Sequence, residues 1–144
     1  MSKSGVSEFQ RLFTGRLWSV MSWERLDAFW KRIEPDGGWY VYAVGEPPPS
    51  APATAEAVAA FIEKIDALLK REHHHDYCGI VYADDLEAPT FVKIFDPNNL
   101  GVSCGFSTNP PLPGWILSRV PPEDLKPAAP LPEGRRRWWR KLLA

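Results

Sequence analysis

The strongest constraint on the fold is a long amphipathic pattern between positions 54 and 71. Apolar side chains recur there every three or four residues, which is the spacing of one face of an α-helix. They are Val58, Phe61, Ile62, Ile65, Leu68 and Leu69. Thr54 precedes them as a suitable N-cap. Such a helix must cover an apolar surface, and 144 residues with 44% hydrophobic side chains suffice for one domain with a core.

A β-sheet is predicted to supply that surface. Segments rich in β-branched and aromatic residues are typical of strands, and they occupy 39–45, 77–83, 90–95, 101–106 and 115–120. Short turn-forming sequences join the middle three, which favours antiparallel hairpins. The long helix lies between the first two strands, so a parallel crossover between those two stays open.

A second helix is predicted over residues 23–33. Ser22 can cap it, and an apolar stripe follows the helical period. The stripe consists of Leu26, Phe29, Trp30 and Ile33. A helical turn is also expected around Phe9, Leu12 and Phe13. The sequence therefore predicts an α+β fold, with a mostly antiparallel sheet of about five strands, one long helix packed on a face and an N-terminal helix.

The chain divides into three parts by composition. Residues 1–120 form the single α+β domain. Residues 121–134 include five prolines and no aromatic residue, which is typical of an extended polyproline II spacer. Residues 135–144 form a cationic amphipathic tail. Its cations contribute +5 to a formal net charge of −1, which leaves −6 for residues 1–134.

The tail has the pattern of a docking helix. On a helical wheel its tryptophans and leucines share one side and most cations the other, whereas Arg135 alone among the cations falls on the apolar side. The predicted partner-binding residues are Arg136, Arg137, Trp138, Trp139, Arg140, Lys141, Leu142 and Leu143. Trp18 and Trp23, which flank the start of the second helix, are either core residues or exposed interface anchors.

Three kinds of partner suit this tail. A protein groove accepts an amphipathic helix, and that groove belongs either to a partner or to the tail's own acidic domain. An anionic membrane surface is an alternative, because basic residues and tryptophans favour it. Nucleic acid is disfavoured by the acidic remainder of the chain. If the tail binds a partner, we expect deletion of 135–144 to leave the melting temperature nearly unchanged.

Metal and cofactor sites are not expected. The consecutive residues His73, His74, His75 and Asp76 resemble a ligand cluster, but neighbouring side chains diverge instead of converging on one ion. A solvated helix terminus is the simpler interpretation. Cys78 and Cys104 are expected to be buried small side chains on separate strands.

No sequence motif identifies a catalytic residue. The alternative to a binding protein is a small enzyme or ligand-binding domain that uses Cys78, Asp84, Asp85 and Asp96, although turn formation is the simpler explanation of the aspartates. Two cysteines, no secretory signal and no apolar run of membrane-spanning length favour a cytoplasmic location, with peripheral contact to the inner face of a membrane as an option. We therefore expect a non-catalytic adaptor or accessory protein.

Overall fold

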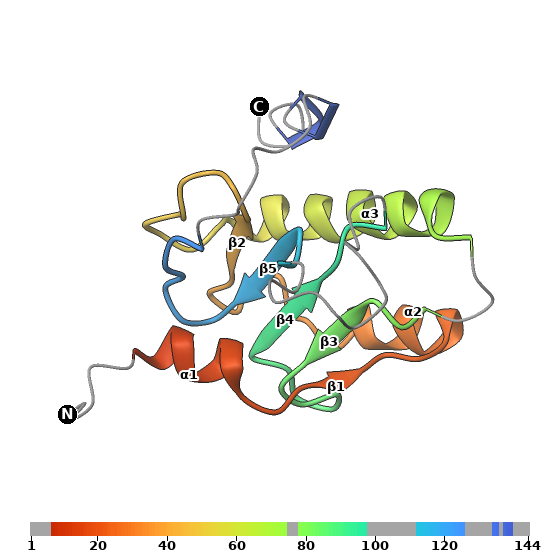
Figure 1. Cartoon of the computed structure of the whole chain (residues 1–144), viewed down its shortest axis with the longest axis horizontal. Coiled ribbons are helices and arrows are strands. Elements are labelled where there is room, and N and C mark those ends of the chain that lie inside the picture. The colour runs from red at the N-terminus through yellow and green to blue at the C-terminus, as the bar shows by residue number, and fades with distance from the viewer. Residues whose placement is uncertain (1–6, 75–77, 98–111, 126–133, 136, 140–144) are drawn as a thin grey trace, which may run out of the picture.

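The computed structural model describes residues 7–74, 78–97, 112–125, 134–135 and 137–139 (Figure 1). The helices are α1 (Glu8–Thr14), α2 (Trp23–Trp30) and α3 (Ala55–Glu72). The strands are β1 (Trp18–Ser19), β2 (Tyr40–Ala43), β3 (Val81–Ala83), β4 (Phe91–Ile94) and β5 (Trp115–Ser118). These elements form one five-stranded antiparallel sheet with helices, which confirms the predicted α+β class.

The strands lie in the order β1-β3-β4-β5-β2, and each neighbouring pair is antiparallel. The parallel pairing considered for the first two predicted strands is therefore wrong. β2 pairs with β5, with Tyr40 opposite Ser118, so β4 and β5 lie between β2 and β3. α3 therefore connects two strands that are not neighbours in the sheet and does not make a parallel crossover.

The predicted strand 101–106 lies outside the described residues. The sequence suggested that it pairs with 90–95, but both sides of β4 are occupied by β3 and β5. β4 instead pairs with the segment that follows the next proline-rich loop, with Ile94 opposite Trp115. The predicted hairpin is therefore not part of the described sheet.

Side-chain caps begin the three helices. Ser7, Ser22 and Thr54 each accept a hydrogen bond from the backbone N–H three residues later, at 3.0 to 3.1 Å. The caps predicted for α2 and α3 are thus confirmed. α2 ends at Trp30, before the predicted limit at residue 33, although Ile33 is still buried after the helix ends.

The sheet separates two apolar clusters. α2 and α3 cover one face, where Phe61, Ile65 and Leu68 of α3 are fully buried (Figure 1). On the other face, Phe9 of α1 packs with Tyr42 and neighbouring residues. The alternation of side chains along each strand produces this division. No described helix is long and apolar enough to cross a bilayer.

Candidate functional site

The described part of the predicted tail packs on its own domain. Residues 134–135 and 137–139 are helical. Trp139 is only 6% exposed and belongs to the main core, where its ring lies edge-on to Phe61 with centroids 6.0 Å apart. Trp138 contacts Trp115 in the same way, with centroids 5.5 Å apart. Both indoles therefore cover the region where α3 meets β5.

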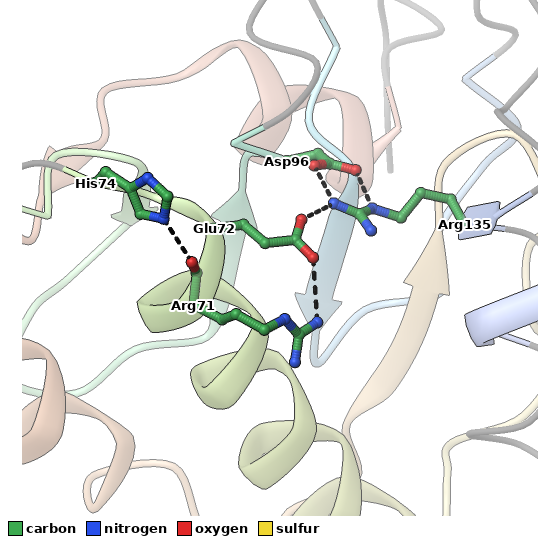
Figure 2. Close-up of polar contacts among 5 residues, drawn as sticks. All are labelled: Arg71, Glu72, His74, Asp96 and Arg135. Carbon is green, nitrogen blue, oxygen red and sulfur yellow. Dashed lines mark hydrogen bonds and ion pairs between the residues drawn. The ribbon is translucent and has the colours of Figure 1, made fainter.

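An ion-pair cluster fixes the start of this helical segment. The guanidinium of Arg135 lies between two carboxylates, as Figure 2 shows. Its Nε and Nη2 bond Asp96, with 2.7 Å from Nη2 to Oδ1, and Nη2 also donates to Glu72. The pKa of Arg135 is raised mainly by its hydrogen bonds to Asp96. Because Asp96 is only 7% exposed, this pairing satisfies a carboxylate that burial would otherwise penalise.

Glu72 titrates under two opposing influences. Burial favours its neutral form, but hydrogen bonds from Arg135 and Arg71 outweigh burial and lower its pKa. Glu72 is the last residue of α3, and Asp96 follows β4. The cluster therefore joins the end of the long helix, the sheet and the C-terminal segment.

Helical spacing explains why the three docked side chains of the C-terminal segment act together. Arg135, Trp138 and Trp139 stand at i, i+3 and i+4, so they project from one side of a helix. Arg137 falls on another side and is exposed. Arg135, the cation that falls on the apolar side of the wheel, is thus the one that pairs with buried carboxylates. The self-docking alternative agrees with these positions.

The predicted partner-binding set is only partly described. Trp138 and Trp139 contact their own domain, and Arg137 is exposed. Arg136, Arg140, Lys141, Leu142 and Leu143 lie outside the described residues. Beneath the docked segment is a cavity of about 20 Å³ next to Asp96, Arg135 and Trp139. It has room for about one water molecule and not for a ligand.

The prediction that the histidine cluster is a solvated helix terminus is wrong for His73. His73 is only 6% exposed, its Nε2 lies 2.9 Å from the carbonyl oxygen of Cys78, and its ring packs against Trp23. His74 is exposed and hydrogen-bonds the Arg71 carbonyl at 2.7 Å. His73 is the C-cap residue of α3, and its side chain packs between Cys78 and Trp23. In the part of the chain that the structure describes, no three His, Cys, Asp or Glu side chains are placed to hold a metal ion. His75 and Asp76 lie outside that part.

Cys78 is a free, fully buried thiol whose pKa is raised by burial, as expected for a small core side chain. Cys104 lies outside the described residues. A buried thiol with a raised pKa is a poor nucleophile.

Asp84 and Asp85 stabilise the turn between β3 and β4. Asp84 accepts hydrogen bonds from the backbone N–H groups of Thr90 and Phe91, at 2.9 and 3.0 Å. Asp85 accepts hydrogen bonds from the backbone N–H groups of Glu87 and Ala88, at 2.8 and 3.0 Å. The turn interpretation of both aspartates is therefore confirmed.

The four residues of the enzyme alternative do not form one site. Asp84 pairs with the start of β4 at Phe91, whereas Asp96 follows the other end of the strand. Asp96 is five positions after Phe91, which in extended chain is a distance of about 17 Å. Asp96 is in addition bonded to Arg135.

A second candidate surface lies at the β1 edge of the sheet, and the sequence predicted it only in part. Among the residues that the structure describes, the large hydrophobic side chains classed as exposed are Trp18 (51%) and Met21 (50%). Both lie on or just after β1, the strand at one edge of the sheet. Of the two tryptophans that flank the start of α2, Trp18 is therefore exposed, whereas Trp23 packs beside His73.

An open groove of about 220 Å³ lies beside this edge of the sheet, between α2 and the turn after β3. Its lining residues are Val20, Arg25, Ala28, Phe29, Arg32, Leu86 and Glu87. Arg32 spans the groove wall, with Nη1 donating to the Leu86 carbonyl at 3.3 Å and Nη2 3.9 Å from Glu87. Three separate segments build this groove, so periodicity within any one of them does not predict it.

Comparisons with protein-family models, curated proteins and solved structures find no match.

Proposed function

We propose that this protein is a non-catalytic adaptor or accessory protein that acts through protein contacts. The contact surface is the edge formed by residues 18–21 together with the adjoining groove. The observation that carries the proposal is the exposure of Trp18 and Met21, two large apolar side chains, at the edge of the sheet. Trp, Met and Arg are enriched where proteins bind one another.

The composition of the surface supports a protein partner over a small molecule. An apolar floor of Val20, Phe29 and Leu86 is bordered by charged Arg25 and Glu87. This combination resembles the apolar centre and polar rim of protein interfaces. The volume of about 220 Å³ lies below the roughly 300–1,000 Å³ of most small-molecule pockets.

The C-terminal segment has a supporting role in this proposal. Arg135, Trp138 and Trp139 hold it on the domain, while exposed Arg137 and the remaining cations offer a secondary contact to an acidic partner. A membrane anchor would need the indoles to enter the bilayer interface, but Trp139 is already buried in the core. We accordingly propose a cytoplasmic, protein-binding role in preference to peripheral membrane attachment.

Affinity capture from cells of the natural source tests the proposal. The bait is the full-length chain, and the variant carries both Trp18→Ala and Met21→Ala. Glu63→Ala, an exposed position on α3, is the matched control. We expect the wild type and the control to capture the same partners, and the double variant to lose them while keeping its melting temperature. Capture of the same proteins by all three baits would contradict this contact surface.

A further inference from the structure

β1 is hydrogen-bonded to the sheet on one side, through β3. Hydrogen bonding to the sheet continues past Ser19: the Val20 N–H donates to the Val81 carbonyl at 2.8 Å, and the carbonyls of Val20 and Met21 accept from the N–H groups of Gly79 and Cys78 at 3.0 and 2.8 Å. The regular extended edge is therefore Trp18–Ser19, and residues 20–21 stay bonded to the same neighbouring segment. An edge strand of this kind is a template on which another strand can pair.

The side chains of this edge are arranged to flank an added strand. Trp18 and Val20 are two positions apart, so they project from one face of the sheet, and Val20 lines the groove. Met21 follows Val20 and is half exposed at the end of this edge. A strand beside β1 would thus meet Trp18 on the groove side at cross-strand contact distance, with the exposed Met21 beyond the end of β1.

The groove chemistry indicates the character of that strand. Its floor is apolar, and its volume of about 220 Å³ suits one or two apolar side chains. Two guanidinium groups, those of Arg25 and Arg32, and one carboxylate, that of Glu87, line the groove. The Arg32–Glu87 pair is long at 3.9 Å and Glu87 is 83% exposed, so this pairing is weak. Arg16 adds a third cation above the Trp18 ring, 5.9 Å from its centroid.

We infer that β1 binds an extended, acidic segment of a partner protein by strand addition, with an apolar side chain of that segment in the groove and its carboxylates beside Arg25 and Arg32. This inference rests on the proposed function and adds the mode of recognition. A second copy of this chain fits less well, because pairing the two edges would bring their Arg16, Arg25 and Arg32 side chains together, and like charges disfavour the contact.

Short synthetic peptides test the inference. Each alternates leucine or valine with a polar residue, and the polar positions are all glutamate, all glutamine or all lysine. Binding to the full-length protein is measured by fluorescence anisotropy. We expect the glutamate series to bind best and the lysine series worst. Methylation of the backbone nitrogens that face β1 should weaken binding at least about tenfold, because it removes ladder hydrogen bonds. Methylation of the alternate nitrogens should have little effect.

Protein variants locate the site. Trp18→Ala should weaken peptide binding at least about tenfold, and Arg25→Glu with Arg32→Glu should abolish the preference for glutamate. Glu63→Ala should bind like the wild type. Equal affinity for the glutamate and lysine series, or no effect of methylation, would overturn the inference. So would self-association in sedimentation that Trp18→Ala removes, since a second copy would then be the occupant. If capture of whole proteins still depends on Trp18 and Met21, the adaptor function stands and only strand addition fails.

Discussion

The C-terminal segment and the β1 edge both combine tryptophan with arginine, yet they have opposite environments. Trp139 is 6% exposed and Trp18 is 51% exposed. Arg135 is paired with Asp96 and Glu72, whereas Arg16 lies over the ring of Trp18. The environments differ because the C-terminal segment packs against an apolar face formed by α3 and β5, with two carboxylates beside it. A docking pattern in a sequence therefore does not reveal whether its partner is in the same chain.

The first prediction tests the apolar face on which the C-terminal segment packs, and it has the largest expected effect. Phe61 is fully buried beneath Trp139, so Phe61→Ala leaves a cavity on which both α3 and the C-terminal segment depend. We expect a loss of about 3–5 kcal/mol in the free energy of unfolding. Lys64→Ala, at an exposed position of the same helix, should change it little. Chemical denaturation measures both, and equal midpoints would refute the assigned helix face.

The second prediction concerns the docked indole itself. Trp139→Ala should lower the free energy of unfolding by about 3 kcal/mol, because a nearly fully buried ring is removed. Arg137→Ala, on another side of the same helical segment and exposed, is the control. Deleting residues 134–144 should likewise lower the melting temperature by several degrees. The sequence predicts the opposite for a tail that binds a partner, namely a nearly unchanged melting temperature after deletion of 135–144. An unchanged melting temperature would mean that the segment contributes nothing to the fold in solution.

The third prediction separates charge from packing. Arg135→Ala leaves the buried Asp96 without its guanidinium, which should cost about 1–3 kcal/mol at neutral pH. The pKa of Glu72 lies below its ordinary value of 4.5, so its ionised form stabilises the folded state above that pH. This contribution is lost as the pH falls through the lowered pKa. The stability gap between wild type and variant should therefore narrow below pH 4.5.

Arg71→Ala is the comparison variant for this effect, because Arg71 bonds the same carboxylate from a more exposed position. Its effect should be smaller at every pH. A constant gap for Arg135→Ala across the acidic range would show that Glu72 is not coupled to the C-terminal segment.

The fourth prediction has the smallest effect on stability. Trp18→Ala should change the free energy of unfolding by less than about 0.5 kcal/mol, because the ring is half exposed and surface substitutions are usually tolerated. The same replacement at Trp139 should cost several times more. Thermal unfolding of the two variants side by side checks the contrast. A large loss of stability for Trp18→Ala would assign this ring to the fold, and would remove the main support for a binding surface at β1.

Local features of the fold could be predicted from the sequence. The apolar period of α3 and the caps at Ser22 and Thr54 depend on neighbouring residues alone, and they agree with the structure. Strand order could not be predicted in the same way. β2 and β5 pair across more than half the chain, and nothing in 39–45 specifies 115–120 over other apolar strands.

The sites illustrate the same limit. The wheel separates Trp138 and Trp139 from most cations, and Arg135 on the apolar side signals a buried acidic partner. The identity of that partner depends on Glu72 and Asp96, which only the fold brings together. The groove beside Val20 combines three segments, so no periodicity predicts it.

The sheet order has a consequence for synthesis on the ribosome. β5 lies between β4 and β2, although it is the last of the described strands to be made. The edges of β2 and β4 that β5 will occupy stay unpaired until residues 115–118 have left the exit tunnel. Non-local pairing of this kind slows folding and leaves strand edges exposed meanwhile. The nascent chain should therefore depend on chaperones up to a late point in translation, and ribosome-bound chains that stop before Trp115 should remain protease-sensitive.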